Sequence, residues 1–321
     1  MKKRGIFACI LFICTFSILS AEGKKEEKYP NRAIRVIVPW AIGGGLAHLL
    51  ADTIKPLLSA ELGIPIVNEA KPGGGTAVGM KELQAATPDG YTIGMNTASI
   101  FGVTHTTKGE VDHRNFELIC SVTEDYYAIS VNSASQWKTL AELVAYMKAN
   151  PGKVRIGHSG VGTAWHVAST VFAQDAGVEL TAVPFNSGGA AVTALMGNHI
   201  EAVSVPFGDM TATLPTGEIR VLAVGAPKRD PFFPDVHTIK EAIGIDSTFG
   251  SFRSFIAPKG TPPEKIKVLE NAIRKVTETA SYKEFCSKNG VNINFEGRTQ
   301  FEKKYAAYGE KMMSVLKTEA Q

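Results

Sequence analysis

The feature that most constrains the fold of this chain is a strand, a glycine-rich loop and a helix that follow one another in both halves of the sequence. Within residues 36–55, an apolar strand pattern stops at Pro39, Gly43-Gly44-Gly45 follows, and apolar residues then recur at helical spacing. Residues 154–176 repeat this order around the loop Ser159-Gly160-Val161-Gly162-Thr163. Strands and helices alternate through most of the remaining chain, which is typical of parallel sheets with helices on both faces. We therefore predict an α/β fold of two similar lobes, each a mainly parallel sheet flanked by helices, rather than one long sheet.

The other elements follow from the same patterns of apolar residues, turn residues and glycines. We expect further strands at 64–67, 91–95, 128–131, 180–184, 202–205, 220–223 and 254–257. We expect further helices up to about residue 86, over 140–149 and 186–196, and two from residue 263 onward. These elements place lobe 1 at 29–125 plus 250–321 and lobe 2 at 126–249, with the last helices folded back onto lobe 1.

The N-terminus has the pattern of an export signal. Residues 2–4 are basic, residues 6–19 are almost wholly apolar, and Ala21-Glu22-Gly23 places small residues at the spacing that a signal peptidase needs. The apolar run is short for a membrane span, so we predict a cleaved signal peptide over 1–23 and a periplasmic protein; an uncleaved membrane anchor is the alternative. Cys14 lies inside the apolar run and lacks small neighbours, which disfavours a lipid anchor at that position.

Charge and ligand chemistry disfavour several classes of function. The chain has 34 Lys and Arg residues against 31 Asp and Glu, and removing residues 1–23 lowers the net charge from +3 to +1. A nearly neutral protein has no electrostatic footprint for nucleic acid or for an anionic membrane surface. The seven histidines are scattered without metal-ligand spacing, and Cys120 and Cys286 are interpreted as buried free thiols. We expect no metal and no cofactor.

The first glycine loop suits an anion. Glycines let backbone amides turn inward, the first N–H groups of a helix lack partners, and the helix dipole favours negative charge at that end. The loop matches neither a Walker A loop nor the dinucleotide fingerprint. An ordinary tight turn between a strand and a helix is the alternative.

The second glycine loop strengthens the interpretation, because Ser159 and Thr163 add hydroxyl donors beside its amides. Thr163 has the alternative role of an N-cap. Two such helix starts that face one another across a cleft would hold a small acid from both sides. A third loop, Gly73-Gly74-Gly75-Thr76, is interpreted mainly as a structural turn beside the hinge.

The sequence favours a binding protein over an enzyme. No G-x-S-x-G elbow surrounds Ser159, and the neighbouring carboxylates Glu124 and Asp125 point to opposite faces of a strand. An exported hydrolase or transferase, with Ser159 and His166 as nucleophile and base, is the enzymatic alternative.

Six segments of the chain resemble the Bug/TctC-type receptors, which are the extracytoplasmic solute receptors of tripartite tricarboxylate transporters. The first is IRVIVPWAIGGGLAHLLA at 34–51, and the others follow in collinear order at 67–94, 139–168, 183–205, 219–242 and 255–273. The resemblance covers nearly the whole chain after the export signal. It implies a two-lobed periplasmic-binding-protein fold, type II-like, whose lobes close about a hinge on a carboxylated ligand.

The resemblance also implies which residues bind that ligand. It implies that the first loop holds one carboxylate, chiefly through backbone amides, with Trp40, Ala41, Ile42, Gly43, Gly44 and Gly45. The segment after the third strand and the opposite lobe complete the set with Asn96, Thr97, Ala98, Ser159, Gly160, Gly162, Thr163, His166, Asn186, Gly188, Gly189, Phe207 and Asp209. The chain departs from the family pattern where Leu46-Ala47 stand in place of Thr-Asp, where Trp40 replaces phenylalanine and where Ile42 replaces alanine or proline. These departures predict a bulkier and less polar mouth.

We therefore expect a monomeric, non-enzymatic receptor that captures a small di- or tricarboxylate, or a similar organic acid, between its lobes. The resemblance implies that the receptor hands this ligand to the membrane permease subunits of a tripartite tricarboxylate-type transporter, with no nucleic-acid partner. A secreted ligand sensor of the same fold, signalling to a membrane partner, is the alternative.

Overall fold

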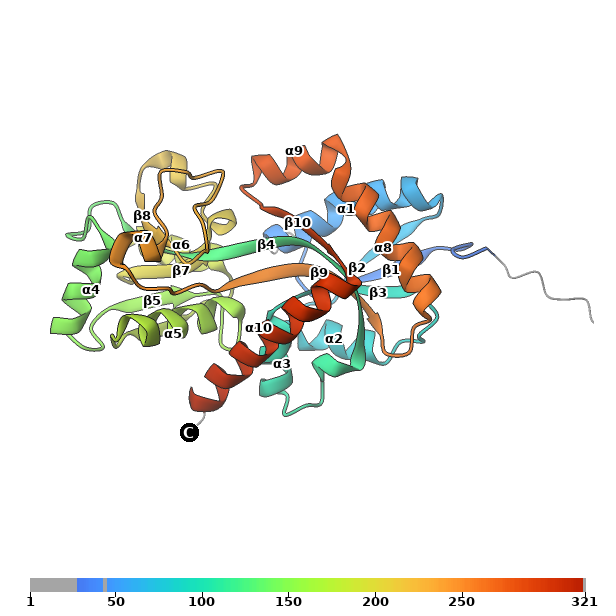
Figure 1. Ribbon diagram of the computed structural model, residues 1–321, viewed down its shortest axis with the longest axis horizontal. Coiled ribbons are helices and arrows are strands. Elements are labelled where there is room, and N and C mark those ends of the chain that lie inside the picture. Colours follow the sequence, from blue (N-terminus) through green and yellow to red (C-terminus); the bar gives the residue numbers. More distant parts are fainter. Residues whose placement is uncertain (1–27, 43–44, 320–321) are drawn as a thin grey trace, which may run out of the picture.

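The computed structural model describes residues 28–42 and 45–319, and Figure 1 shows them as two groups of helices and strands joined by two long strands. The export signal predicted over 1–23 and two predicted site residues, Gly43 and Gly44, lie outside the described residues. Ten strands of the described part form one continuous mixed sheet that runs through both groups.

The first group, lobe 1, is built on three parallel strands in the order β2-β1-β3. Its strands and helices are β1 (Ile34–Val38), α1 (Leu46–Leu62), β2 (Ile66–Ala70), the 3₁₀ turn η1 (Gly74–Thr76), α2 (Ala77–Gln84), β3 (Thr92–Thr97), α3 (Ser99–Thr106) and η2 (His113–Asn115). The carboxyl ends of these parallel strands lie at one edge of the sheet, where loops of open α/β sheets bind ligands. The loops that follow β1, β2 and β3 therefore meet at that edge.

The second group, lobe 2, repeats this plan with three parallel strands in the order β6-β5-β7. Its elements are α4 (Leu140–Ala149), β5 (Arg155–His158), α5 (Ala164–Ala176), β6 (Thr181–Pro184), α6 (Gly188–Met196), β7 (Ala202–Pro206), η3 (Phe207–Asp209), η4 (Leu214–Thr216), β8 (Ile219–Val224) and α7 (Ile239–Ile243). The predicted architecture of two α/β lobes is thus confirmed, but the expectation of separate sheets is wrong, because one mixed sheet runs through both lobes. The parallel pairing is confined to the outer strands of each lobe.

The two lobes are joined through antiparallel pairing of the strands β4 (Phe116–Asn132) and β9 (Gly250–Pro258). The first part of β4 pairs with β9, and from Tyr127 onward β4 pairs with β7 and β8 instead. The lobe boundaries predicted at 126 and 250 remain predictions, and the change of pairing partner at Tyr127 supports them. The sequence predicted only 128–131 of β4, because Glu124 and Asp125 interrupt its apolar pattern.

The C-terminal region contains three helices and a strand where the sequence predicted two helices. They are α8 (Pro263–Glu278), α9 (Ala280–Lys288), β10 (Ile293–Gly297) and α10 (Arg298–Glu319). Thr279 separates α8 from α9, because its backbone is extended and its side chain caps α9 by accepting a hydrogen bond from the amide of Tyr282. Helix α8 packs on α1 in lobe 1 as predicted, whereas α10 crosses below the sheet and contacts α3 of lobe 1 and α5 of lobe 2 (Figure 1).

The hydrophobic core follows the same division. One cluster lies between α1, α8 and the sheet of lobe 1, and includes the fully buried Ile54, Phe255 and Ile273. A second cluster runs from Phe101 of lobe 1 to Phe172 of lobe 2. Full burial of one such side chain contributes roughly 1.5–3 kcal/mol relative to leaving it exposed. The second cluster therefore gives the two lobes a common apolar base.

Candidate ligand-binding cleft

A cleft of about 900 Å³ lies between the two lobes. Its walls come from the loops that follow β1, β2, β3 and β5, from the starts of α1, α5 and α6, and from β9 at its floor. The lining residues are Pro39, Trp40, Ala41, Gly45, Leu46, Ala47, Leu49, Pro72, Gly73, Gly75, Thr76, Thr97, Ser99, Ser159, Thr163, Ala164, Trp165, Asn186, Ser187, Gly188, Gly189, Gly208, Asp209, Thr211, Ala212, Ser251, Arg253 and Asn289.

The start of α1 opens into this cleft, and no side chain of residues 28–42 or 45–319 caps it. Gly45 is the N-cap residue and has no side chain to offer, and the first turn contains no acidic residue. Leu46 and Ala47 line the cleft. The first N–H groups of a helix have no partner inside the helix, and the helix dipole makes this end attractive to anions. The departure of Leu46-Ala47 from the polar family pattern thus coincides with a helix start that no described side chain caps.

The start of α5 is capped by the protein itself. The Thr163 hydroxyl accepts a hydrogen bond from the amide of His166 at 3.3 Å and donates one to the Gly160 carbonyl at 2.7 Å. The Ser159 hydroxyl in turn donates to Thr163 at 3.2 Å. The Thr163 side chain therefore caps α5 and also lines the cleft, as the two predicted roles require.

Two histidines accept hydrogen bonds from the backbone of the loop before α5. The rings of His158 and His166 lie 4.5 Å apart, the Gly160 amide donates to Nδ1 of His158 at 3.2 Å, and the Gly162 amide donates to Nδ1 of His166 at 3.3 Å. Burial, together with the neighbouring His166, lowers the pKa of His158 to about 4. Neither histidine lines the cleft, so His166 positions the loop in this structure rather than facing the cavity.

Helix α3 joins the cleft to the contact between the lobes. The Ala164 amide at the start of α5 donates to the Ser99 hydroxyl at the start of α3, at 3.3 Å. One turn further along α3, a Cβ added to Gly102 would lie 1.8 Å from the Gly162 carbonyl oxygen. Only glycine allows this approach of two backbones, so the lobes touch at this point through their main chains.

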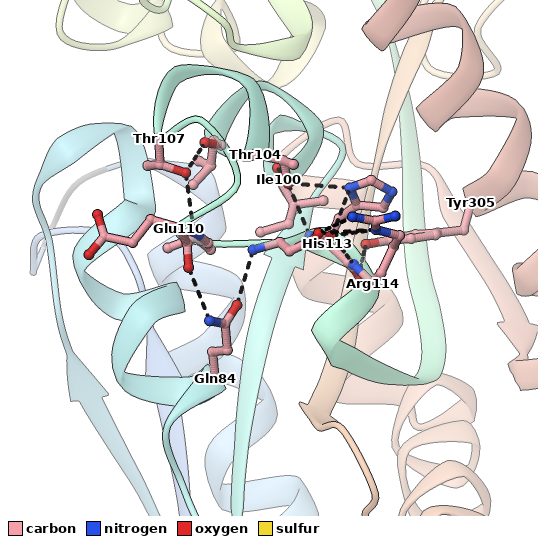
Figure 2. Close-up of polar contacts among 11 residues, drawn as sticks. Gln84, Ile100, Thr104, Thr107, Glu110, His113, Arg114 and Tyr305 are labelled. Carbon is pink, nitrogen blue, oxygen red and sulfur yellow. Dashed lines mark hydrogen bonds and ion pairs between the residues drawn. The ribbon is translucent and has the colours of Figure 1, made fainter.

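The far end of α3 is fixed by the polar contacts shown in Figure 2. The Thr104 hydroxyl accepts a hydrogen bond from the His113 amide at 3.0 Å, and Gln84 of α2 donates to the Glu110 carbonyl at 3.1 Å. The Tyr305 hydroxyl of α10 donates to the His113 carbonyl at 3.2 Å. Helices α2 and α10 thus hold the segment that follows α3, and so place Ser99 and Gly102 against lobe 2.

The loop after β2 was interpreted from sequence mainly as a structural turn, and the structure places it in the cleft wall. Pro72, Gly73, Gly75 and Thr76 all line the cavity. The signal for this placement was available, because β1 and β2 are neighbouring parallel strands and their carboxyl ends share one edge.

The floor of the cleft carries a cation that the sequence did not reveal. Arg253 of β9 lines the cleft, is only 8% exposed, and forms an ion pair with Asp125 of β4. It also donates to the Thr123 hydroxyl at 3.3 Å, whereas its buried Nε has no partner in the described part of the chain. No local motif marks Arg253, because its partner Asp125 lies 128 positions away in the sequence.

The start of α6 faces the cleft from lobe 2. Ser187 caps this helix by accepting a hydrogen bond from the Ala190 amide at 3.1 Å. The carboxylate of Asp209, from η3, lies against the first residue of the helix, because a Cβ added to Gly188 would lie 2.0 Å from Oδ2 of Asp209. Burial raises the pKa of Asp209 to about 6, although Arg253 opposes that shift.

The cleft brings together ten of the residues that the sequence singled out: Trp40, Ala41, Gly45, Thr97, Ser159, Thr163, Asn186, Gly188, Gly189 and Asp209. Ile42 is 83% exposed and lies outside the lining. The others lie beside or beneath the walls: Asn96, Ala98, Gly160, Gly162, His166 and Phe207. Phe207 is buried and its ring stacks on that of Phe233.

Within residues 28–42 and 45–319, no group of three or more His, Cys, Asp and Glu side chains is placed to hold a metal ion. No helix in these ranges combines the length and the apolar character that crossing a membrane requires.

Comparison with known proteins connects this cleft to a family. Residues 50–318 match the family model of the tripartite tricarboxylate transporter family receptors, TctC. A protein from Cupriavidus necator, the UPF0065 protein in the gbd 5' region, is 30% identical over 86% of this chain and 84% of its own length.

Two solved structures share the fold. A TctC solute-binding protein from Polaromonas, solved without ligand, is 28% identical with a TM-score of 0.77, covering 90% of this chain and 99% of its own. A protein from R. palustris, solved with adipate, is 25% identical with a TM-score of 0.80, covering 90% and 98%. The two-lobed periplasmic-binding-protein fold implied by the sequence is confirmed. The match over most of the chain shows that this protein belongs to the tripartite tricarboxylate transporter family receptors, the TctC family.

Proposed function

We propose that this chain is a periplasmic solute-binding receptor that captures a small carboxylate between its lobes and delivers it to the membrane permease subunits of a tripartite transporter. Membership of the TctC family supports the role of receptor. The adipate in a structure that is 25% identical supports a carboxylate as ligand. The export signal predicted over residues 1–23 supports the location.

The observation that carries the proposal is the uncapped start of α1 at the wall of the cleft. Hydrogen bonds to a charged group contribute roughly 1.5–3 kcal/mol each. The helix dipole adds about 0.3–1 kcal/mol for an anion in the first turn. Two or three amides of this helix start therefore supply enough free energy to hold one carboxylate without a dedicated cationic side chain.

Contacts between the lobes provide the means of closure. Besides the bond from Ala164 to Ser99, the Asn292 side chain of lobe 1 donates to the Asp230 carboxylate of lobe 2 at 2.6 Å. A ligand favours the closed form only if it binds that form more tightly than the open one. A carboxylate at the α1 start that also touches lobe 2 meets this condition, and the closed form is then the shape that the permease recognises.

The same geometry favours binding without turnover. A nucleophilic serine needs a base within hydrogen-bond reach. The Ser159 hydroxyl instead donates to Thr163, which caps α5. We therefore infer that Ser159 belongs to the wall of a binding site, and that the chain is not an enzyme.

The test uses two helices that begin with the same two residues. Helix α1 begins Leu46-Ala47 and helix α4 begins Leu140-Ala141, and Ala141 is exposed and lies outside the cleft lining. Proline is tolerated in the first turn of a helix but removes one N–H group. Ala47→Pro thus removes an amide at the proposed site, and Ala141→Pro makes the same change elsewhere.

A thermal-shift panel of di- and tricarboxylates first identifies a ligand, and isothermal titration then gives its Kd for each variant. We expect Ala47→Pro to weaken binding at least about tenfold, or about 1.4 kcal/mol, and Ala141→Pro to leave the Kd unchanged. Equal Kd values for the two variants would contradict the proposed role of α1. The absence of any thermal shift across the panel would remove the proposed function.

A further inference from the structure

The carboxylate of Asp209 lies in the wall of the cleft, although the start of α1 in the same cleft suits an anion. Asp209 lines the cleft and is half-buried. Within residues 28–42 and 45–319, no hydrogen bond or ion pair engages its side chain, because the nearby Arg253 is paired with Asp125 instead. A desolvated carboxylate without a partner is costly, which makes Asp209 a position where a ligand group can supply what the protein does not.

The position of Asp209 also decides which helix starts remain open to an anion. Its carboxylate lies against Gly188, at the first residue of α6. The positive end of the α6 dipole is therefore already offset by a charge of the protein itself. A ligand carboxylate brought to α6 would meet Asp209 and be repelled, whereas one at the uncapped start of α1 would not.

The cleft thus has two ends with opposite preferences. The start of α1 favours a negative group, and Asp209 favours a group that donates a hydrogen bond. Arg253 does not remove this asymmetry, because it is already paired with Asp125 at the floor of the cleft. A ligand that satisfies both ends carries an anion at one end and a donor at the other.

We propose that Asp209 is a specificity-determining residue that accepts a hydrogen bond from a hydroxyl or ammonium group of the ligand, so that hydroxy or amino carboxylic acids are preferred over plain dicarboxylates. The inference rests on the proposed function, since it assumes that a carboxylate of the same ligand occupies the α1 start. It predicts a ligand with a fixed orientation, with the carboxylate toward α1 and the donor toward η3.

The experiment compares acids that share one carbon skeleton. Succinate, malate and aspartate differ only in having no donor, a hydroxyl or an ammonium group beside a carboxylate, and glutarate, 2-hydroxyglutarate and glutamate form a second series. Isothermal titration at pH 7.5 is run with the wild type, with Asp209→Asn, and with Asp235→Asn as a control for an exposed aspartate of the same lobe.

We expect the wild type to bind the acid with a donor at least about tenfold more tightly than the plain diacid of the same series. Asp209→Asn should remove most of that preference, because it abolishes the charge while keeping the shape. A larger loss for the amino acid than for the hydroxy acid would identify an ammonium group as the donor, and a larger loss for the hydroxy acid would identify a hydroxyl. Asp235→Asn should retain the wild-type pattern.

Two outcomes separate this inference from the proposed function. If plain diacids bind as tightly as their hydroxy and amino counterparts, and Asp209→Asn changes all of them equally, the role of Asp209 is overturned while carboxylate binding stands. If Ala47→Pro has no effect on any acid that binds, the carboxylate is not held at α1 and the orientation proposed here is overturned, whereas the proposed function is removed only if no acid binds at all. The thermal unfolding of each variant is measured alongside, so that a loss of folding is distinguished from a loss of specificity.

Discussion

The starts of α1 and α5 are built from the same sequence of strand, glycine loop and helix, yet they differ in what satisfies their amides. At α5, Thr163 and two histidines of the same lobe provide the hydrogen-bond partners. At α1, no side chain of the described residues caps the helix. The difference lies in the side chains around the loop and not in the motif itself.

This contrast assigns different tasks to the two lobes. The α5 loop is assembled before any ligand arrives, and Gly162 presents its backbone to Gly102 of the other lobe. Among the described residues, no side chain caps the start of α1, and an uncapped helix start beside a cleft favours an anionic ligand. We therefore infer that the α5 loop of lobe 2 is preorganised and contacts lobe 1 on closure, and that the start of α1 in lobe 1 binds the carboxylate.

The largest effect is expected from blocking the contact that the α5 loop makes. Gly102→Ala would normally stabilise a helix by roughly 0.5–1 kcal/mol. Here its Cβ would lie 1.8 Å from the Gly162 carbonyl oxygen, so the lobes cannot meet. We expect the Kd for the ligand to rise about a hundredfold, which is about 2.7 kcal/mol.

Isothermal titration measures this change, and small-angle scattering with ligand shows whether the lobes stay apart. His105→Ala in the same helix is the control and should bind as the wild type does. An unchanged Kd for Gly102→Ala would mean that the α5 loop does not mediate closure, and the assigned tasks of the lobes would be wrong.

An intermediate effect is expected from pH, because the pKa values of the buried His158 and the half-buried Asp209, both in lobe 2, shift in opposite directions. Folding lowers the pKa of His158 from 6.5 to about 4, so the unfolded chain binds the proton more tightly than the folded protein does. As the pH drops from 6.5 toward 4, His158 therefore lowers the free energy of unfolding. Folding raises the pKa of Asp209 from 3.8 to about 6, so the folded protein binds the proton more tightly than the unfolded chain does. As the pH rises from 3.8 toward 6, Asp209 therefore lowers the free energy of unfolding. Each group changes the free energy of unfolding by at most about 1.4 kcal/mol per pH unit inside its window.

Urea unfolding between pH 4 and 7 separates the two groups. Relative to the wild type, Asp209→Asn should show a steeper loss of stability on acidification, and His158→Asn should show a shallower one. We expect differences of about 1–2 kcal/mol between the variants at the two ends of this range. Parallel pH profiles for all three proteins would contradict the burial of these groups in the native state.

The smallest effect is expected from removing the α5 cap. Thr163→Ala should lower the free energy of unfolding by about 1 kcal/mol, the usual cost of losing an N-cap threonine. The Kd should change less than about threefold, or about 0.65 kcal/mol, because the lost hydrogen bonds lie within the protein. Chemical unfolding and titration of the same preparation measure both quantities. If Thr163→Ala weakens binding as much as Ala47→Pro does, the two helix starts share the ligand and their contrast disappears.

The sequence predicts those parts of the fold whose signals are local. Helix α4 was predicted with the bounds that the structure shows, because Thr139 precedes its start and Asn150 follows its end. Ten cleft residues were also singled out, because the resemblance to the family implied them and the glycine loops near residues 43–45 and 159–163 supported some of them.

The remaining features depend on partners far away in the sequence. Most of β4 was not predicted, because nothing in the sequence near Glu124 and Asp125 shows that Lys304 and Arg253 will compensate their charges. The hydrogen bond that Tyr308 donates to Glu124 is equally remote in sequence. For the same reason the sequence did not mark Arg253 as a residue of the cleft floor. Long-range compensation of charge makes a strand possible where the local pattern argues against one.

The central claim is that amides at the start of α1 bind a carboxylate, and backbone amide resonances test it directly. Two-dimensional NMR of the nitrogen-labelled protein follows the signals of Ala47 and His48 during titration with the ligand, and Ala141 and Glu142 of α4 serve as references. We predict that the α1 signals shift and saturate at the Kd measured by calorimetry, while the α4 signals stay in place. Saturable binding that leaves the signals of Ala47 and His48 unmoved would contradict the account.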